Sequence, residues 1–242
     1  MNSSEETNME KEKEKKERAK QLLGQGYLEV FFDFHSENRF SAKELFTMAE
    51  KAECHNTGWP IGVTLTKPDL APFATDEGIE AFILSRSDAS FDYWSIKKNG
   101  NFYFIRTHGE DTKPTKSTKG NSVLWLDTRI WRIAEVFLYC QKLGNELKLN
   151  ATNKIDIIII HTGLKGRTLV CGDPMRIWFD DEYFCKSEKH QFRVAESLDF
   201  IKLNYKELIF KLCSDLFYFF SQCDLNRGIC DGIVDDFLKS RV

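Results

Sequence analysis

The sequence predicts an α+β fold in which a mixed β-sheet and packed helices form a single domain. Runs of aromatic and β-branched residues, typical of strands, recur along the chain, and two of them flank an Asn-Gly pair. Helical spacing of apolar residues appears over 127–147 and 204–219. With 242 residues, 42% of them hydrophobic, the chain is long enough to bury a substantial core.

The first 26 residues differ from the rest in composition. They form a Glu- and Lys-rich leader that we expect to be a helical arm, ended by Gly24 and Gly26, before a domain that spans 27–242. The leader lacks an apolar signal region, and no apolar run approaches the roughly 20 residues needed to cross a bilayer. The sequence therefore predicts a cytoplasmic protein with no membrane association.

Cysteine content and charge narrow the class of protein further. The seven cysteines form no C-x-x-C pair, and several lie in apolar helical patterns, which favours reduced thiols that pack as small hydrophobic residues. The formal net charge of −3 argues against a protein coated in nucleic acid, although it leaves room for a local basic patch.

Elements of the first half follow from local signals. Residues 27–34 are aromatic and β-branched, which predicts a strand. Ser41 and Glu44 have capping-box spacing, so a helix is expected from there to about Glu53. After this helix the pattern predicts, in order, a strand at 58–65, a surface loop at 66–78 and a short helix at 77–84.

The pair Asn99-Gly100 is the clearest turn signal in the sequence. It separates 91–96 from 102–105, and an Asn-Gly pair between two such runs predicts a β-hairpin. Beyond it we predict, in order, a polar loop at 113–120, a long helix at 127–147, a strand at 154–160 buried on both faces, strands at 167–171, 175–179 and 190–195, a helix that Asn204 and Glu207 open with capping-box spacing, and a last helix at 229–239.

The segment 161–167 is the first candidate for a binding site. Gly163 and Gly166 allow a tight turn with exposed amides, and Lys165 and Arg167 add positive charge beside them. Such a turn can hold a phosphate through backbone and charge-assisted hydrogen bonds. The alternative is an ordinary hairpin turn whose charges face water. The segment lacks the Gly-Lys-Ser/Thr ending of a P-loop, which excludes nucleotide hydrolysis of that type.

The aromatic hairpin is the second candidate. Its rings interleave with Lys97, Lys98 and Arg106, a mixture that can stack bases and contact phosphates. Alternation along a strand, however, sends half of these rings to a core face, so plain hairpin packing is the alternative. We take Lys97 and Arg106 as outer contacts of a ligand held mainly by the glycine turn.

Metal and catalytic motifs are weak. The five histidines are scattered, and Glu53-Cys54-His55 is the only tight group of ligand types, so we expect no metal, no cofactor and no catalytic residues. Pro68-Asp69 and Asp111-Thr112-Lys113 resemble fragments of nuclease motifs, but both fall in predicted loops. A calcium loop at 224–235 fails because its twelfth position is aspartate and its fifth is glycine.

Three motifs, taken in order, carry a family resemblance. They are Gly58-Trp59-Pro60, Tyr93-Trp94 with Asn99-Gly100-Asn101-Phe102-Tyr103, and Gly163-Leu164-Lys165-Gly166-Arg167-Thr168-Leu169. Over 27–220 this order resembles the carboxy-terminal part of bacterial proteins that begin with an AlbA-type, Schlafen-like DNA-binding domain. The charged leader does not match that domain, so the resemblance carries no expectation of DNA binding. It implies a non-catalytic regulatory or sensing role in a bacterial cell, with defence against foreign DNA as one setting.

The sequence as a whole favours a non-enzymatic binding or regulatory module that recognises an anionic ligand, nucleic acid or a protein partner. Gly163, Lys165, Gly166 and Arg167 are the expected contacts, with Lys97 and Arg106 outside them. Two alternatives stay open. One is a metal-dependent nuclease or phosphodiesterase, and the other is a structural subunit of an oligomer.

Overall fold

The computed structural model describes residues 26–84, 91–112, 123–172 and 183–239. Its strands are β1 Tyr27–Asp33, β2 Phe73–Ala74, β3 Gly78–Leu84, β4 Phe91–Lys97, β5 Phe102–Thr107, β6 Val123–Trp125, β7 Lys154–Thr162, β8 Thr168–Val170, β9 Tyr183–Phe184 and β10 Lys189–Ser197. Its helices are α2 Ala42–Ala52, α3 Gly109–Thr112, α4 Leu126–Glu146, α5 Leu198–Leu203, α6 Tyr205–Tyr218 and α7 Arg227–Leu238. The leader up to residue 25, the polar loop at 113–120 and the strand predicted at 175–179 lie outside these residues.

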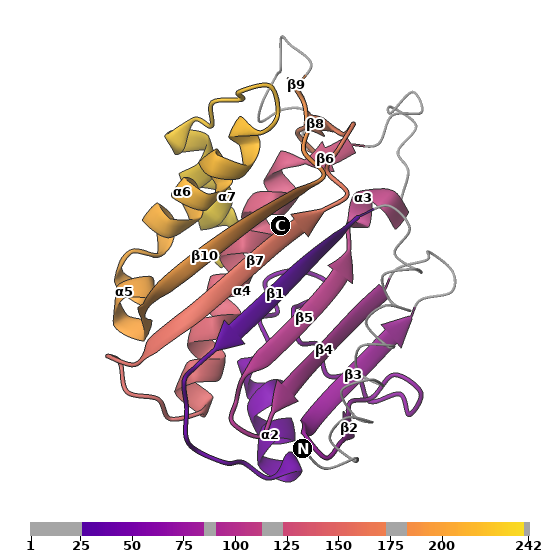
Figure 1. Cartoon of the computed structure of the whole chain (residues 1–242), viewed down its shortest axis with the longest axis vertical. Helices are drawn as coiled ribbons and strands as arrows, with labels where there is room; N and C mark the ends of the chain where they lie inside the picture. Colours follow the sequence, from indigo (N-terminus) through magenta and orange to yellow (C-terminus); the bar gives the residue numbers. More distant parts are fainter. Residues whose placement is uncertain (1–25, 85–90, 113–122, 173–182, 240–242) are drawn as a thin grey trace, which may run out of the picture.

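The strands form two sheets. The large one has seven strands in the order β10-β7-β1-β5-β4-β3-β2, and each of its pairings is antiparallel (Figure 1). The small sheet has the order β6-β8-β9, and its parallel pairing joins β6 to β8. The predicted α+β class is confirmed, with antiparallel pairing throughout the large sheet and mixed pairing in the small one.

One face of the large sheet is covered by α2, α4, α6 and α7, with α4 packed against the other three (Figure 1). We call this the helix face and the opposite one the second face. Alternation along the central strands produces both: Val30 and Phe32 of β1 are buried in the main core, while Phe31 between them lies on the second face. Strand β7 alternates in the same way, and Ile158 on its second face is only half-buried. The prediction that this strand is buried on both faces therefore holds fully for the helix face alone.

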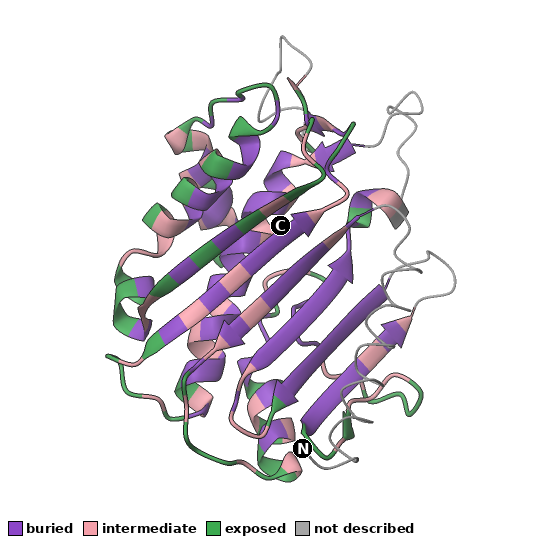
Figure 2. Cartoon of the chain, viewed as in Figure 1, coloured by how far each residue is buried: buried purple, intermediate pink, exposed green. Residues whose placement is uncertain are grey.

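Burial on the second face falls from the middle of the sheet toward β10. Strands β4 and β5 are buried almost throughout, whereas exposed residues alternate with buried ones along β10 (Figure 2). A second apolar cluster lies on this face, formed by Phe91, Tyr93, Tyr103 and Ile105. The second face is therefore apolar beside β4 and β5 and polar at β10.

Several predicted elements are confirmed with their local chemistry. Ser41 and Glu44 form the capping box of α2, with the Glu44 carboxylate accepting from the Ser41 amide at 2.8 Å. Gly100 has a φ of 88°, the left-handed conformation that the tight β4–β5 turn requires. Helix α6 also begins where predicted, but Asn204 does not cap it, because its side-chain amide donates to the carbonyl of Phe200 instead.

Two predictions in the first half are wrong. The segment 77–84, expected to be a helix, is strand β3, which pairs with β4 from Gly78 to Leu84. The segment 58–65, expected to be a strand, has no regular structure. Its side chains Ile61 and Val63 are buried as a strand's would be, but its carbonyls accept hydrogen bonds from distant side chains rather than from a neighbouring strand. Among the described residues, no helix is long and apolar enough to cross a membrane.

Candidate functional site

The glycine turn that follows β7 has the backbone expected of it but not the free amides. Gly163 and Gly166 have φ values of 69° and 79°. The amide of Gly163 donates to the Glu188 carboxylate at 3.0 Å, and that of Gly166 donates to the Cys185 carbonyl at 2.8 Å. These amides bind groups of the protein itself, and a carboxylate already occupies the turn. Lys165 is exposed, as predicted.

Arg167 is the main correction at this turn. It was predicted to offer its charge to a ligand, but only 1% of the residue is exposed. Its two terminal nitrogens donate to the two carboxylate oxygens of Asp111 at 2.7 and 2.6 Å, and one of them also donates to the Val123 carbonyl at 2.9 Å. Arg167 therefore links the turn to α3 and β6. Asp111, which belongs to one of the two nuclease-like fragments, is thus paired with Arg167, and Asp69 of the other fragment lies in the irregular segment before β2.

A buried polar network continues from this pair beneath α4. The Arg129 guanidinium donates to Nδ1 of His108 at 2.9 Å and to the Glu110 carboxylate at 3.2 Å. Nε2 of His108 lies 3.2 Å from the Thr162 carbonyl. Because Nδ1 accepts from Arg129, the proton of a neutral His108 is on Nε2. This network was not predicted from the sequence. Its signal was the ionisable residues His108 and Glu110, which follow the apolar strand β5.

His161 lies next to His108, with ring centroids 6.1 Å apart, and it is fully buried. Neither of its ring nitrogens has a hydrogen-bond partner within the described part of the chain. Burial lowers the pKa of both histidines well below the ordinary value of 6.5, and the charge of Arg129 lowers it further. Both side chains are therefore neutral in the folded protein near neutral pH.

These histidines predict a loss of stability in mild acid. Their folded-state pKa values lie below the unfolded value, so the unfolded chain binds more protons once the pH falls below about 6.5. Each histidine then lowers the free energy of unfolding by up to about 1.4 kcal/mol per pH unit. Urea unfolding at pH 7.5 and 5.5 measures the effect. We expect His161→Leu to reduce the difference between the two pH values, and equal stability of the parent protein at both would contradict the prediction.

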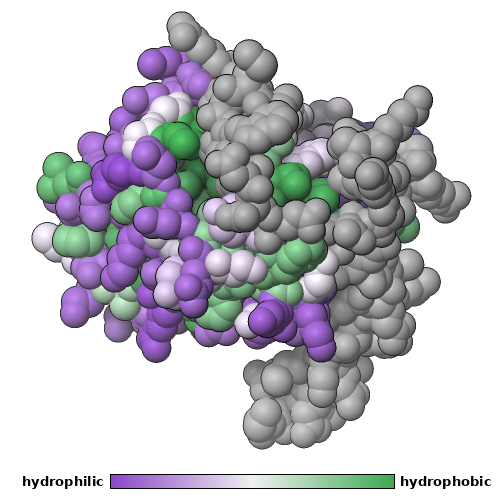
Figure 3. Space-filling view, turned by 90° about the horizontal axis from the view of Figure 1, so that it is seen from above, coloured by the Kyte–Doolittle hydropathy of each residue, from purple (hydrophilic) through white to green (hydrophobic). Residues whose placement is uncertain are grey.

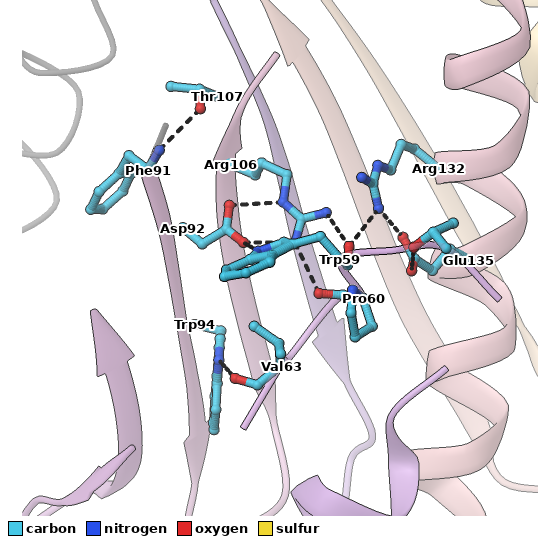
Figure 4. Close-up of polar contacts among 11 residues, drawn as sticks. Trp59, Pro60, Val63, Phe91, Asp92, Trp94, Arg106, Thr107, Arg132 and Glu135 are labelled. Carbon is cyan, nitrogen blue, oxygen red and sulfur yellow. Dashed lines mark hydrogen bonds and ion pairs between the residues drawn. The ribbon is translucent and has the colours of Figure 1, made fainter. Parts of the chain in front are cut away.

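Arg106 is the second correction. Predicted as an outer ligand contact, it is buried on the helix face and donates to both carboxylate oxygens of Asp92, at 2.8 and 2.7 Å. It also donates to the carbonyls of Trp59 and Pro60 at 3.1 and 2.9 Å (Figure 4). Arg132 reaches the same Trp59 carbonyl at 3.0 Å. These two guanidinium groups hold the irregular segment 58–65 in place.

The aromatic hairpin is not an open stacking platform. Each of its six rings is at most 5% exposed. The rings are those of Phe91, Tyr93, Trp94, Phe102, Tyr103 and Phe104. The alternative of hairpin packing, stated from the alternation rule, therefore fits the structure, and bases could not reach these faces without a large rearrangement.

Lys97 is the remaining candidate from the sequence, and it lines a pocket of about 480 Å³ on the second face. We call this the second-face pocket. Its apolar part includes Phe31 and Tyr103, whose ring centroids are 4.7 Å apart, together with Ile158 and Ile160. Its charged residues are Lys97, Arg193, Asp33 and Asp156. The pocket draws on strands β1, β4, β5, β7 and β10.

The charges around the second-face pocket are not all compensated. Asp156 accepts from Nε2 of His35 at 2.8 Å and from Nε of Arg193 at 3.1 Å, and these bonds lower its pKa. The exposed Lys97 forms no ion pair with any residue that the structure describes. Ser95, 8% exposed, also lines the pocket, and its hydroxyl has no hydrogen-bond partner in the described ranges. The Lys97 ammonium group is thus available to a ligand, and a buried hydroxyl without a partner among the described residues lies in the pocket wall beside it.

Groups that could hold a metal are not brought together in the described part of the chain, where no cluster of three or more His, Cys, Asp or Glu side chains has suitable geometry. Comparisons with protein-family models, with curated proteins and with solved structures found no match.

Proposed function

We propose that this chain is a non-enzymatic binding module and that the second-face pocket is its ligand site. The observation that carries the proposal is the coincidence of three features in one pocket: an uncompensated ammonium group on Lys97, an unpartnered hydroxyl on Ser95 and an aromatic wall at Phe31. A few convergent polar groups within a mainly apolar concavity are typical of small-molecule sites. Lys97 and Lys165 are both exposed cations among the sequence candidates, and Lys97 lines this pocket.

The ligand class follows from these groups. Arg193 uses Nε and one terminal nitrogen on Asp156, and it remains two-thirds exposed beside the pocket. A carboxylate or phosphate near Lys97 and Arg193 would form charge-assisted hydrogen bonds, and a flat apolar body would pack against Phe31 and Tyr103. A volume of about 480 Å³ suits a small molecule better than a strand of nucleic acid. We therefore favour a small planar anion among the ligand classes that the sequence left open.

Binding rather than catalysis is proposed for a physical reason. The most enclosed carboxylate of the pocket, Asp156, is held in its charged form by His35 and Arg193, which makes it a weak proton acceptor. The resemblance to the carboxy-terminal module of AlbA-type, Schlafen-like bacterial proteins also favours a non-catalytic role. A regulatory or sensing role in a bacterial cell, with defence as one setting, is part of this proposal.

A panel of small planar anions tests the proposal. Nucleoside monophosphates, cyclic nucleotides and aromatic carboxylates would be screened by thermal shift, and the strongest would be titrated by calorimetry. We expect at least one to bind, and Lys97→Met to weaken it about tenfold because one charge-assisted hydrogen bond is lost. Ser95→Ala should weaken it less, because the Ser95 oxygen is buried in the pocket wall and a neutral hydrogen bond is the most that can be lost.

Lys165→Met is the matched control, since Lys165 is also an exposed lysine but lies in the glycine turn between β7 and β8. It should leave binding unchanged. If no member of the panel binds, the proposal fails. If Lys165→Met weakens binding while Lys97→Met does not, the glycine turn is the site and the second-face pocket is not.

A further inference from the structure

The strand β10 ends the large sheet, and its outer edge is the basis of a second inference. All nine of its residues, from Lys189 to Ser197, pair with β7 on one side. No strand in the described ranges pairs with its other side. An edge of this length carries a row of backbone donors and acceptors that can pair with another extended chain.

Helix α6 runs back along this edge and forms the opposite wall of a groove (Figure 1). We call it the β10–α6 groove, with a volume of about 480 Å³. One wall consists of seven consecutive residues of β10, 190–196. The other is one face of α6, contributed by Leu208, Lys211, Leu212, Asp215 and Tyr218, together with Phe219 directly after the helix. A strand edge facing a helix across a groove is the geometry in which extended peptides add to a sheet.

Apolar and unpartnered groups lie at one end of the groove. Tyr218 and Phe219 are 60% and 40% exposed. The His190 ring lies 4.2 Å from the Phe219 ring, centroid to centroid, and its Nε2 is buried without a hydrogen-bond partner among the described residues. Seen from above, hydrophobic residues reach the surface among hydrophilic ones on this flank, where α6 and α7 lie (Figure 3). A bound chain would cover the exposed Tyr218 and Phe219 side chains.

The charges along the groove define the chemistry of the occupant. Because α6 runs opposite to β10, Lys211 lies level with the middle of the strand, where Arg193 is exposed. Asp215 lies near His190 at one end, and Glu196 lies at the other. Because the Arg193 guanidinium is bound to Asp156, the cation near the centre that has no ion pair with the described residues is Lys211, and carboxylates lie toward both ends. An acidic residue at the centre of the occupant complements this arrangement.

We propose that the β10–α6 groove binds a segment of a partner protein in extended conformation, with an acidic residue near its middle and apolar residues at alternate positions. The segment adds a strand beside β10, so its backbone supplies the hydrogen bonds and its alternate side chains contact Leu208 and Leu212. A second copy of the chain fits less well, because α6 flanks the edge and would meet the α6 of the other copy (Figure 1).

Peptides from a random decapeptide display library, selected on the whole chain, are the probe. We expect the selected peptides to share an alternating apolar pattern with a central Asp or Glu, and Lys211→Glu to weaken them at least tenfold. Lys165→Glu, a charge reversal at another exposed lysine, should not. Arg193 is left unchanged because it also lines the second-face pocket, so this test and that of the proposed function fail independently.

Backbone methylation separates strand addition from side-chain binding. Methylating the peptide amides that face β10 should abolish binding, whereas methylating the alternate set should leave it within a few fold. Three results would overturn the proposal. The first is a selection that enriches no more peptides than a control selection without the protein. The second is peptide binding that survives both Lys211→Glu and methylation of either set of amides. The third is self-association of the chain that Lys211→Glu abolishes, which would assign the groove to a second copy.

Discussion

Replacing Arg167 with methionine is expected to lower the free energy of unfolding by about 3–5 kcal/mol, because it leaves a buried carboxylate without its partner. The Arg167 side chain is 1% exposed and that of Asp111 is 9% exposed, and two hydrogen bonds of 2.7 and 2.6 Å join them. The substitution also removes the donor to the Val123 carbonyl. Urea unfolding of the two proteins measures the difference.

Two variants show whether the effect comes from the ion pair. Lys165→Met removes a positive charge from the same turn, but from an exposed side chain, and should change stability by no more than about 0.5 kcal/mol. Adding Asp111→Asn to Arg167→Met should recover part of the loss, because the amide leaves no uncompensated charge. If Arg167→Met and Lys165→Met are equally mild, Arg167 is not the buried link that its contacts indicate.

Signals that act within a few residues predicted much of the fold. The capping box of Ser41 and Glu44, the Asn99-Gly100 turn and the helical apolar spacing of α4 each fix a structure locally, and each was confirmed. These signals need no knowledge of the rest of the chain, since the hydrogen bonds and turns they specify are made between near neighbours.

The elements that sequence reasoning missed depend on distant partners. Strand β3 has the sequence GIEAFIL, in which apolar residues follow neither the helical nor the strand spacing clearly. It is a strand because β4 pairs with it. The segment 58–65 alternates like a strand, yet the Arg106 guanidinium, 46 residues beyond Pro60, binds its carbonyls instead. The local sequence pattern cannot show whether backbone groups pair with a neighbouring strand or with a distant side chain.

The candidate site was harder still. Arg167 and Arg106 were chosen because they are cations near turns or rings, but their carboxylate partners lie 56 and 14 residues away, and nothing local marks the pairs. The second-face pocket brings together side chains of five strands, so its composition depends on strand order. Only Lys97 could be named in advance, as an exposed cation at the end of a predicted hairpin strand.

Replacing Arg106 with methionine is the second change for which we expect a loss of about 3–5 kcal/mol, because Asp92, 5% exposed, would then lie buried without its guanidinium partner. Thermal and urea unfolding both measure it. Unlike Arg167, Arg106 also holds the carbonyls of Trp59 and Pro60, so hydrogen exchange should rise in 58–65 before the rest of the chain unfolds.

The same variant separates a structural role from a binding role. If Arg106 acts by holding Asp92 and the segment 58–65, Arg106→Met should lower stability while the protein that remains folded binds planar anions with unchanged affinity. If it contacts a ligand, as the sequence alone suggested, affinity should fall while stability stays within about 0.5 kcal/mol of the parent. The buried position of the guanidinium on the helix face, opposite the second-face pocket, favours the first outcome. Both measurements can be made on one sample, so each outcome excludes the other directly.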